Sequence, residues 1–244
     1  MATTERDLAK PDFSIVVPVH NEENILAPTV HDLVCELENR SSNFELILVE
    51  NGSTDDSPNI TDALSADDPR ITSLHLPEPS YGDALRAGLS SATGEIIGHF
   101  SVDIVDFEFF DEALQELKTV DLVLGSKLID STEDRRPFIR RIGSQVFHGL
   151  SRKVLGVPVA DTHGIKLMKG NVMLPVINQC VGGGEIFDDE LVIRAARVDV
   201  TMSEISFRCE EIRPSRTSVL TRAAKAMRQM IGLRFTLWKE RVGG

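Results

Sequence analysis

The stretch FSIVVPVHNEEN, residues 13–24, decides the fold because an apolar run rich in β-branched residues stops abruptly in a polar turn. An apolar run of this kind predicts a buried strand. A helical pattern of apolar residues then continues to about residue 37. The segment therefore predicts a strand, a turn and a helix in succession.

The same alternation continues through the first half of the chain. Further strands are predicted at FELILVE (44–50), ITSLHL (71–76), EIIGHF (95–100) and VDLVLGS (120–126), and a helix at YGDALRAGLSSA (81–92). We therefore expect an α/β fold with a mostly parallel sheet and helices on both faces. Ligands of such sheets bind beyond the carboxyl ends of the strands. The predicted site lies where PVHNEE, VENGSTD and FSVDIVD meet.

The composition is that of a soluble globular protein, with 244 residues, 41% hydrophobic and 26% charged. No apolar run approaches the roughly 20 residues that span a bilayer, and the polar N-terminus lacks the pattern of a signal peptide. A cytoplasmic protein, peripheral at the inner membrane face if it binds lipid, is therefore expected. Cys35, Cys180 and Cys209 form no C-x-x-C pair, so we expect ordinary thiols.

Charge is distributed unevenly along the chain. Residues 1–134 carry 7 Lys and Arg against 28 Asp and Glu, whereas residues 135–244 carry 19 against 10. The second half is therefore the expected binder of anionic groups, either phosphates or a lipid surface. Nucleic acid is disfavoured because no basic stripe is interleaved with aromatic residues.

In the second half the regular alternation of strands and helices ends, but no linker or repeat is found in the sequence. Its predicted segments are a basic helical stretch (135–156), a turn with a short extended run DTHGIKLM (161–168), a helix with an acidic start (185–198), a strand (200–208) and a basic amphipathic helix (217–241). We expect one domain over residues 1–218 and a C-terminal helical extension over 219–244. This helix suits an anionic membrane, but packing on its own domain or on a second subunit is an equal alternative.

Two common nucleotide-binding motifs are missing. No G-x-G-x-x-G follows the first strand, and no G-x-x-x-x-G-K-[ST] occurs. Gly182, Gly183 and Gly184 precede a helix without a clear strand before them, so a flexible loop is favoured over a phosphate cradle. Hydride transfer with a nicotinamide cofactor is disfavoured.

The ordered set VVPVHNEENI, LILVENGSTDDS, YGDALRAGLSSATGEII and FSVD resembles the family 2 glycosyltransferases, which have the GT-A fold. Further segments, GSK, RRIGSQVFHGL, DTHGIK and FDDELVIRA, resemble the polyprenyl-phosphate (dolichyl-phosphate) mannose and glucose synthases. The resemblance spans about residues 13–218 and implies a nucleoside-diphosphate-sugar donor.

The resemblance implies a set of substrate-binding positions. They are Pro18, His20, Asn21 and Glu22 in the first turn, Glu50, Asn51, Gly52 and Ser53 in the second, Gly82 and Arg86 in the helix after the third strand, Ser101 and Val102 after the fourth, and Lys127 and Arg141 in the basic region. The family usually has an aromatic residue where His20 stands. For NGSTD, capping of the next helix by Ser53, Thr54 or Asp55 is the alternative interpretation. For residues 81–88 it is plain helix packing.

The resemblance also locates a metal turn, and here the sequence departs from the family. The family's D-x-D and a further ligand two residues on read Ser101, Asp103 and Val105 in this chain. One carboxylate and the substrate phosphates could still hold Mg²⁺ or Mn²⁺ weakly, or the metal is dispensable. Fixed cations can neutralise the leaving diphosphate instead. The candidates are Lys127, Arg140, Arg141, Arg213 and Arg216.

Several acidic residues and one histidine have two interpretations. Asp106 is a substitute metal ligand or, as we favour, a helix cap, and His163 is a metal ligand or, as we favour, a structural residue. Asp188, Asp189 and Glu190 match a family helix that faces the sugar or acceptor, and they also suit a first helical turn. An alcohol acceptor would need Asp188, Glu190 or Asp161 as a base, whereas a lipid phosphate would need none.

The expected function is inverting transfer of a hexose from a GDP-mannose- or UDP-glucose-type donor to a polyprenyl phosphate. The expected catalytic residues are Asp103, Asp188, Glu190, Arg213 and Arg216. Two alternatives are transfer to a small-molecule or glycan hydroxyl, and a non-catalytic nucleotide-binding protein with a degenerate metal site.

Overall fold

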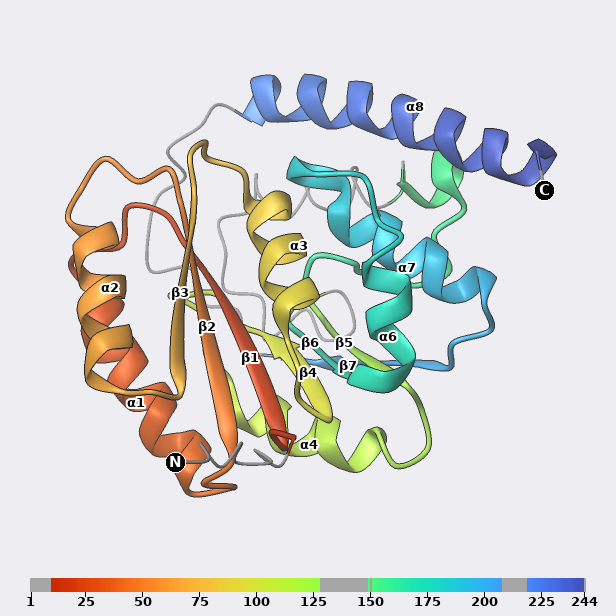
Figure 1. Cartoon of the computed structure of the whole chain (residues 1–244). Helices are drawn as coiled ribbons and strands as arrows, with labels where there is room; N and C mark the ends of the chain where they lie inside the picture. The colour runs from red at the N-terminus through yellow and green to blue at the C-terminus, as the bar shows by residue number, and fades with distance from the viewer. Residues whose placement is uncertain (1–9, 128–148, 150, 208–218, 244) are drawn as a thin grey trace, which may run out of the picture.

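The computed structural model of the chain describes residues 10–127, 149, 151–207 and 219–243. At its centre is a seven-stranded sheet in the order β3-β2-β1-β4-β6-β5-β7 (Figure 1). The strands are β1 Phe13–Val19, β2 Phe44–Asn51, β3 Ile71–Leu76, β4 Ile96–His99, β5 Leu122–Ser126, β6 Lys166–Lys169 and β7 Met202–Ser206. The predicted mostly parallel α/β sheet is confirmed.

Most of the helices lie where the sequence predicts them. They are α1 Leu26–Glu38, α2 Ser57–Asp67, α3 Tyr81–Ser91, α4 Phe107–Glu116, α6 Gly170–Ile177, α7 Phe187–Arg197 and α8 Val219–Gly243, with a short 3₁₀ turn η1 at Gly184–Ile186. Residues 151–155 are also helical. The rest of the predicted basic helix, 135–148, lies outside the described residues. Helix α6 was not predicted.

Strand β6 is the exception in direction, since it runs antiparallel to both β4 and β5. Strand β5 ends at the carboxyl edge of the sheet, and β6 begins at that same edge, with Leu124 opposite Lys166. The connection therefore does not return the chain to the opposite edge, as a parallel crossover would. The segment around residues 161–166 is consequently placed beside the ends of the parallel strands.

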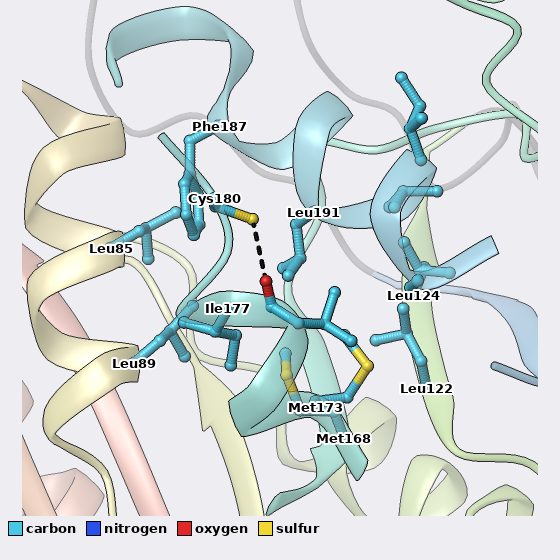
Figure 2. Packing of buried hydrophobic residues seen from close by; sticks show 14 of the residues in the cluster. Leu85, Leu89, Leu122, Leu124, Met168, Met173, Ile177, Cys180, Phe187 and Leu191 are labelled. Atoms are coloured by element: carbon cyan, nitrogen blue, oxygen red, sulfur yellow. Dashed lines mark hydrogen bonds between the residues drawn. The ribbon is translucent and has the colours of Figure 1, made fainter. Parts of the chain in front are cut away.

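Two apolar clusters cover the two faces of the sheet. One lies against α1 and α4, and the other lies against α3, α6 and α7. Figure 2 shows the second cluster, in which Leu85 and Leu89 of α3 approach Ile177 of α6 and Phe187 of α7. Cys180 is buried in it, and burial raises the pKa of its thiol to about 12, as expected for an unreactive cysteine.

One glycine sets the distance between α3 and the sheet. A Cβ built on Gly88 would lie 2.3 Å from a methyl carbon of Val16 and 2.9 Å from one of Val49. Any larger residue would push the helix away from β1 and β2. The start of α3 is thereby held close to the carboxyl ends of these strands.

Helix α8 lies along α7 and the η1 turn (Figure 1). Met230, Leu233 and Leu237 on its inward face are buried in the same cluster as α3 and α7. Packing on its own domain, one of the predicted alternatives, is therefore confirmed for one face of the helix. Among the described residues, no helix has the length and hydropathy needed to cross a membrane.

Candidate active site

The turns that follow β1 and β2 are joined by their own polar groups. Asn21 has a positive φ of 56°, its N–H donates to Ser53 Oγ at 2.9 Å, and its Oδ1 accepts from the Thr54 N–H at 2.7 Å. The Glu22 N–H donates to Ser57 Oγ at 2.7 Å. The predicted meeting of these two turns at one sheet edge is confirmed, with Asn21 and Ser53 in direct contact.

Asn51 connects three segments at this edge. Its Nδ2 donates to the Val19 carbonyl at 2.8 Å, and its Oδ1 accepts from the Ser80 N–H at 3.0 Å. The His20 Nδ1 lies 2.9 Å from the Asn51 carbonyl. Because a carbonyl can only accept, Nδ1 carries the proton in that contact. Asn51, expected to contact nucleotide, thus uses its side chain to connect the end of β1 to the start of α3.

Glu50 also binds neighbouring residues of the protein. Its buried carboxylate accepts from the Ser53 N–H at 2.5 Å and lies 3.4 Å from His75 Nδ1. Burial alone would lower the pKa of His75, but the carboxylates of Asp62 and Glu50 raise it. Gly52, at φ 65°, packs where a Cβ would lie 2.8 Å from the Pro79 nitrogen. The contact of Glu50 with a base stays a prediction.

The other residues predicted in these two turns contribute to the structure of this sheet edge. Pro18 lies in β1 opposite Val49. Helix α2 has Asp56 as its N-cap without a side-chain cap bond, while Asp55 accepts from the Ser57 N–H at 3.0 Å. The capping interpretation of NGSTD therefore holds for Asp55 and is wrong for Ser53 and Thr54, which bind the first turn.

The start of α3 packs directly on the glycine loop at 182–184. A Cβ on Gly82 would lie 2.3 Å from the Gly184 carbonyl, and one on Gly183 would lie 2.4 Å from the Asp83 carboxylate. Arg86 donates to Asp83 at 2.9 Å and to the Val181 carbonyl at 3.4 Å. The glycines therefore permit a close approach of the loop to α3, and Arg86 stabilises this contact.

The SVD turn after β4 presents one carboxylate. The Ile104 N–H closes the turn on the Ser101 carbonyl at 3.0 Å, and Val102 is buried with its carbonyl 3.3 Å from Thr29 Oγ1. Asp103 is partly exposed and has no hydrogen bond or ion pair to another described residue. Asp106 accepts from the Phe109 N–H at 3.0 Å, which confirms it as the cap of α4.

Beside the end of β4 lies a buried charged group that the sequence reasoning missed. The Lys166 ammonium donates to Asp188 at 2.6 Å and to the Gly164 carbonyl at 2.9 Å, and lies 3.3 Å from His99 Nε2. Burial and the Lys166 charge lower the pKa of His99 to about 3. Burial would raise the pKa of Asp188, but Lys166 holds it below its usual range. The sequence feature that could have revealed this group is Lys166 inside the apolar run IKLM, because a lysine buried in such a run needs a partner.

The acids beside Asp188, Asp189 and Glu190, also bind neighbouring residues of the protein. Asp189 accepts from Thr162 Oγ1 at 2.6 Å and from Ser151 Oγ at 2.9 Å. Glu190 accepts from the Gly182 N–H at 2.5 Å and from Arg194 Nε at 2.6 Å. Both carboxylates are buried. Glu190 thus fixes the glycine loop, and these contacts argue against the expected role of Glu190 as an acid facing the acceptor.

The start of the β6 segment joins the end of β5. Asp161 accepts from the Lys127 N–H at 3.2 Å and from the His163 N–H at 2.9 Å. The Lys127 ammonium lies 5.6 Å from the centre of the Phe207 ring. His163 Nδ1 lies 2.9 Å from Thr162 Oγ1, in keeping with a structural histidine. Within the described residues, no group of three or more His, Cys, Asp and Glu is arranged to hold a metal.

Four of the expected cations cannot be placed. Arg140, Arg141, Arg213 and Arg216 lie outside the described residues. The last two follow β7, which runs parallel to β5 and ends at the same edge. Their expected contact with phosphates stays a prediction.

The seven-stranded sheet, with polar turns at its carboxyl edge, is a GT-A type fold. The family model of Glycosyl transferase family 2 matches residues 14–165. The chain therefore belongs to glycosyl transferase family 2.

Three named relatives each match between 66% and 92% of this chain. Glycosyltransferase AglD of Haloferax volcanii is 27% identical over 200 residues, covering 79% of this chain and 32% of the relative. A prophage bactoprenol glucosyl transferase homolog of Escherichia coli is 31% identical, covering 66% and 53%. Dolichyl-phosphate beta-glucosyltransferase ALG5D of Trichomonas vaginalis is 27% identical, covering 92% and 75%. The chain thus spans only a third to three quarters of these relatives.

Solved structures share the fold at low identity. Glucosyl-3-phosphoglycerate synthase from Mycobacterium tuberculosis, in complex with Mn²⁺, UDP and glucosyl-3-phosphoglycerate, has a TM-score of 0.60 and 20% identity, covering 91% of this chain and 78% of that one. Mannosyltransferase PcManGT from Pyrobaculum calidifontis, in complex with GDP-Man and Mn²⁺, has a TM-score of 0.58 and 18% identity, covering 93% and 65%. They establish the GT-A architecture of this chain.

Proposed function

We propose that the chain transfers a hexose, with inversion, from a nucleoside-diphosphate sugar to a polyprenyl phosphate. An oxygen of the lipid phosphate attacks the anomeric carbon, and the bond to the nucleoside diphosphate breaks, leaving its electron pair on that diphosphate. Curated relatives named for bactoprenol and for dolichyl phosphate support this acceptor class. Such an acceptor also places the reaction at a membrane surface.

The observation that carries the proposal is the state of the acids that a hydroxyl acceptor would require. Asp188 is paired with Lys166, Glu190 holds a loop and an arginine, and Asp161 accepts from two backbone N–H groups. Each of these carboxylates is thus bound to a cation or to backbone donors within the protein. A phosphate acceptor already carries its charge and needs no strong base.

The donor side is supported by the two joined turns after β1 and β2. His20, Asn21 and Ser53 hold these turns at the edge where the resemblance expects the base and ribose. Two of the named relatives are glucosyl transferases, so UDP-glucose is the first donor to test and GDP-mannose the second.

Charge on the leaving diphosphate has to be neutralised. Of the three expected metal-ligand positions, only Asp103 offers a carboxylate, so the residues fit an ion held loosely by Asp103 and the substrate phosphates. A bound Mg²⁺ or Mn²⁺ would act there as a Lewis acid. We propose that basic side chains, among them Lys127, Arg213 and Arg216, supply much of the neutralisation.

The test of this reaction uses the full chain, labelled donor and a short polyprenyl phosphate in detergent, with the matching polyprenyl alcohol as control. We expect labelled lipid from the phosphate and little from the alcohol. Donor hydrolysis without lipid product, or equal use of the alcohol, would overturn the acceptor assignment.

A thermal-shift series with GDP, UDP and their sugars, with and without Mn²⁺, identifies the donor. Stabilisation by one nucleotide in the absence of Mn²⁺ supports neutralisation by side chains. Stabilisation by none would favour a non-catalytic protein.

A further inference from the structure

Helix α8 leaves one apolar stripe uncovered. Met227, Ile231, Phe235 and Trp238 have exposed fractions of 39%, 61%, 55% and 56%. Their spacing of four, four and three residues places them on one face of the helix. Phe235 and Trp238 stack at 5.9 Å between ring centres. The stripe lies away from the inward face formed by Met230, Leu233 and Leu237.

Positive charges border this stripe on both sides. At about 100° per residue, Arg234 falls on one side of the stripe, and Arg228 and Lys239 fall on the other; all three are exposed. The Lys239 ammonium lies 4.6 Å from the centre of the Phe235 ring. The helix therefore presents aromatic and aliphatic side chains with cations on both sides.

The only acidic residue of α8 is turned away from that surface. Glu240 pairs with Arg194 at 2.8 Å and lies 3.6 Å from Arg197, both on α7. No carboxylate of the helix is therefore available to neutralise Arg228, Arg234 or Lys239. The outward face has a net positive charge.

A groove of about 430 Å³ opens beside the stripe. Its lining combines apolar side chains with two guanidinium groups; the residues include Val154, Leu155, Arg197, Ile231, Arg234 and Trp238. Arg234 also donates to the Val154 carbonyl. Apolar surface close to cations is the combination that an anionic lipid, with acyl chains below a phosphate, would cover.

We propose that this face of α8 is a membrane-docking surface that lies in the interface of a bilayer containing anionic lipid. Charge complementarity decides between a bilayer and a second copy of the chain. A two-fold contact through the stripe would bring the cations of one copy close to those of the other, which is unfavourable. An anionic lipid surface neutralises the cations on both sides and buries the apolar side chains at once.

The surface is separate from the transfer site but linked to it by structure. Gln229 Nε2, on the same helix, donates to the Gly183 carbonyl at 3.3 Å, and Gly183 packs against the start of α3. Docking would therefore hold the glycine-loop side of the domain next to the bilayer. The docking surface itself does not depend on the proposed reaction.

The test uses the only tryptophan of the chain, Trp238, as an intrinsic reporter. The full chain is titrated with phosphatidylcholine vesicles and with vesicles that contain about one third phosphatidylglycerol, and Trp emission and co-sedimentation are recorded. We expect a blue shift and co-sedimentation with the anionic vesicles, both weakened by salt. Absence of a blue shift with either vesicle would overturn the proposal.

Matched variants locate the surface. Ile231→Ser and Phe235→Ser should each weaken partitioning at least about tenfold, because each removes a large apolar side chain from the lipid. Val198→Ser is the control, since Val198 is 56% exposed and caps α7 instead of lying on α8. Arg228→Gln combined with Lys239→Gln should weaken binding to anionic vesicles alone. Undiminished binding of the stripe variants would overturn the assignment.

Light scattering without vesicles tests whether a second copy of the chain covers the stripe instead of a bilayer. We expect a monomer at micromolar concentration. A dimer that Ile231→Ser dissociates would assign the stripe to a second copy and overturn the proposal. Transfer to a short lipid phosphate in detergent, measured on the same variants, separates failure of docking from failure of the reaction.

Discussion

Lys166 and Asp188 form an ion pair at 2.6 Å whose side chains are 0% and 4% exposed. The two residues come from an antiparallel strand and from the first turn of α7, and Lys166 lies opposite His99 at the end of β4. A buried pair of this kind is weak evidence for stability, but losing one partner leaves an uncompensated charge. The pair therefore fixes α7 against β6.

Replacing one partner should be far more damaging than replacing both. Lys166→Met should cost about 3–5 kcal/mol and lower Tm by about 10 °C, whereas Lys166→Met with Asp188→Leu should recover most of the loss. Lys169→Met is the control in the same strand. It breaks the half-exposed pair with Asp121 at 3.0 Å and should cost under about 1 kcal/mol. An equal loss for Lys166→Met and Lys169→Met would contradict this view.

The free energy of unfolding should depend on pH because of His99. Its pKa is lowered to about 3 from an ordinary 6.5, so below pH 6.5 the unfolded chain binds a proton that the folded chain does not. Stability must then fall as the pH falls through this window, by about 1.4 kcal/mol per pH unit. Urea unfolding of the parent and of His99→Gln between pH 6.5 and 5 measures the difference. Parallel curves for the two proteins would show that His99 is not buried as a neutral ring.

Asn51 should matter before any nucleotide is bound. Asn51→Ala leaves the buried Val19 carbonyl and Ser80 N–H without their partner and should cost about 2–4 kcal/mol. Asn51→Asp keeps an acceptor for Ser80 but places a buried carboxylate oxygen against the Val19 carbonyl, so its loss should be at least as large. Unfolding is measured without ligand, and UDP and GDP binding afterwards. Full stability with weakened nucleotide binding would instead make Asn51 a direct ligand contact.

Glu190→Gln separates a supporting role from proton transfer. The amide can still accept from the loop N–H groups but loses its ion pair with Arg194, so we expect a loss of about 1.5–3 kcal/mol in stability. Turnover with a lipid phosphate, assayed well below Tm, should stay within about threefold. A fall of about 100-fold or more with intact folding would mean that Glu190 moves a proton.

Local patterns were sufficient to predict the strands and their polar ends. The run at 13–19 and the polar turn after it require a buried strand and an exposed edge, wherever the strand lies in the sheet. In parallel neighbours the ends must coincide, so the contact between Asn21 and Ser53 follows.

The direction of β6 and the Lys166–Asp188 pair could not be predicted in this way. Both depend on how the connection after β5 returns to the sheet, which is a long-range property. Nor does a residue type reveal which way it faces. Glu50 and Glu190 are the acids that a substrate could use, yet both bind neighbouring N–H groups.

The SVD turn offers the sharpest test of the metal's role. Asp103 has a partly exposed carboxylate without a bond to another described residue, while Ser101 closes the turn through its backbone carbonyl, which a substitution of its side chain leaves in place. Ser101→Asp should therefore preserve the turn, add a second oxygen ligand and lower the Mn²⁺ concentration for half-maximal turnover by about tenfold. Asp103→Asn should raise that concentration, and Ser101→Asn is the control for side-chain size. If the parent turns over fully in EDTA and Ser101→Asp gains nothing from Mn²⁺, side-chain cations neutralise the diphosphate. If EDTA abolishes turnover of the parent and Mn²⁺ restores it fully, Asp103 and the substrate phosphates suffice to hold the ion, and neutralisation by Lys127, Arg213 and Arg216 is wrong.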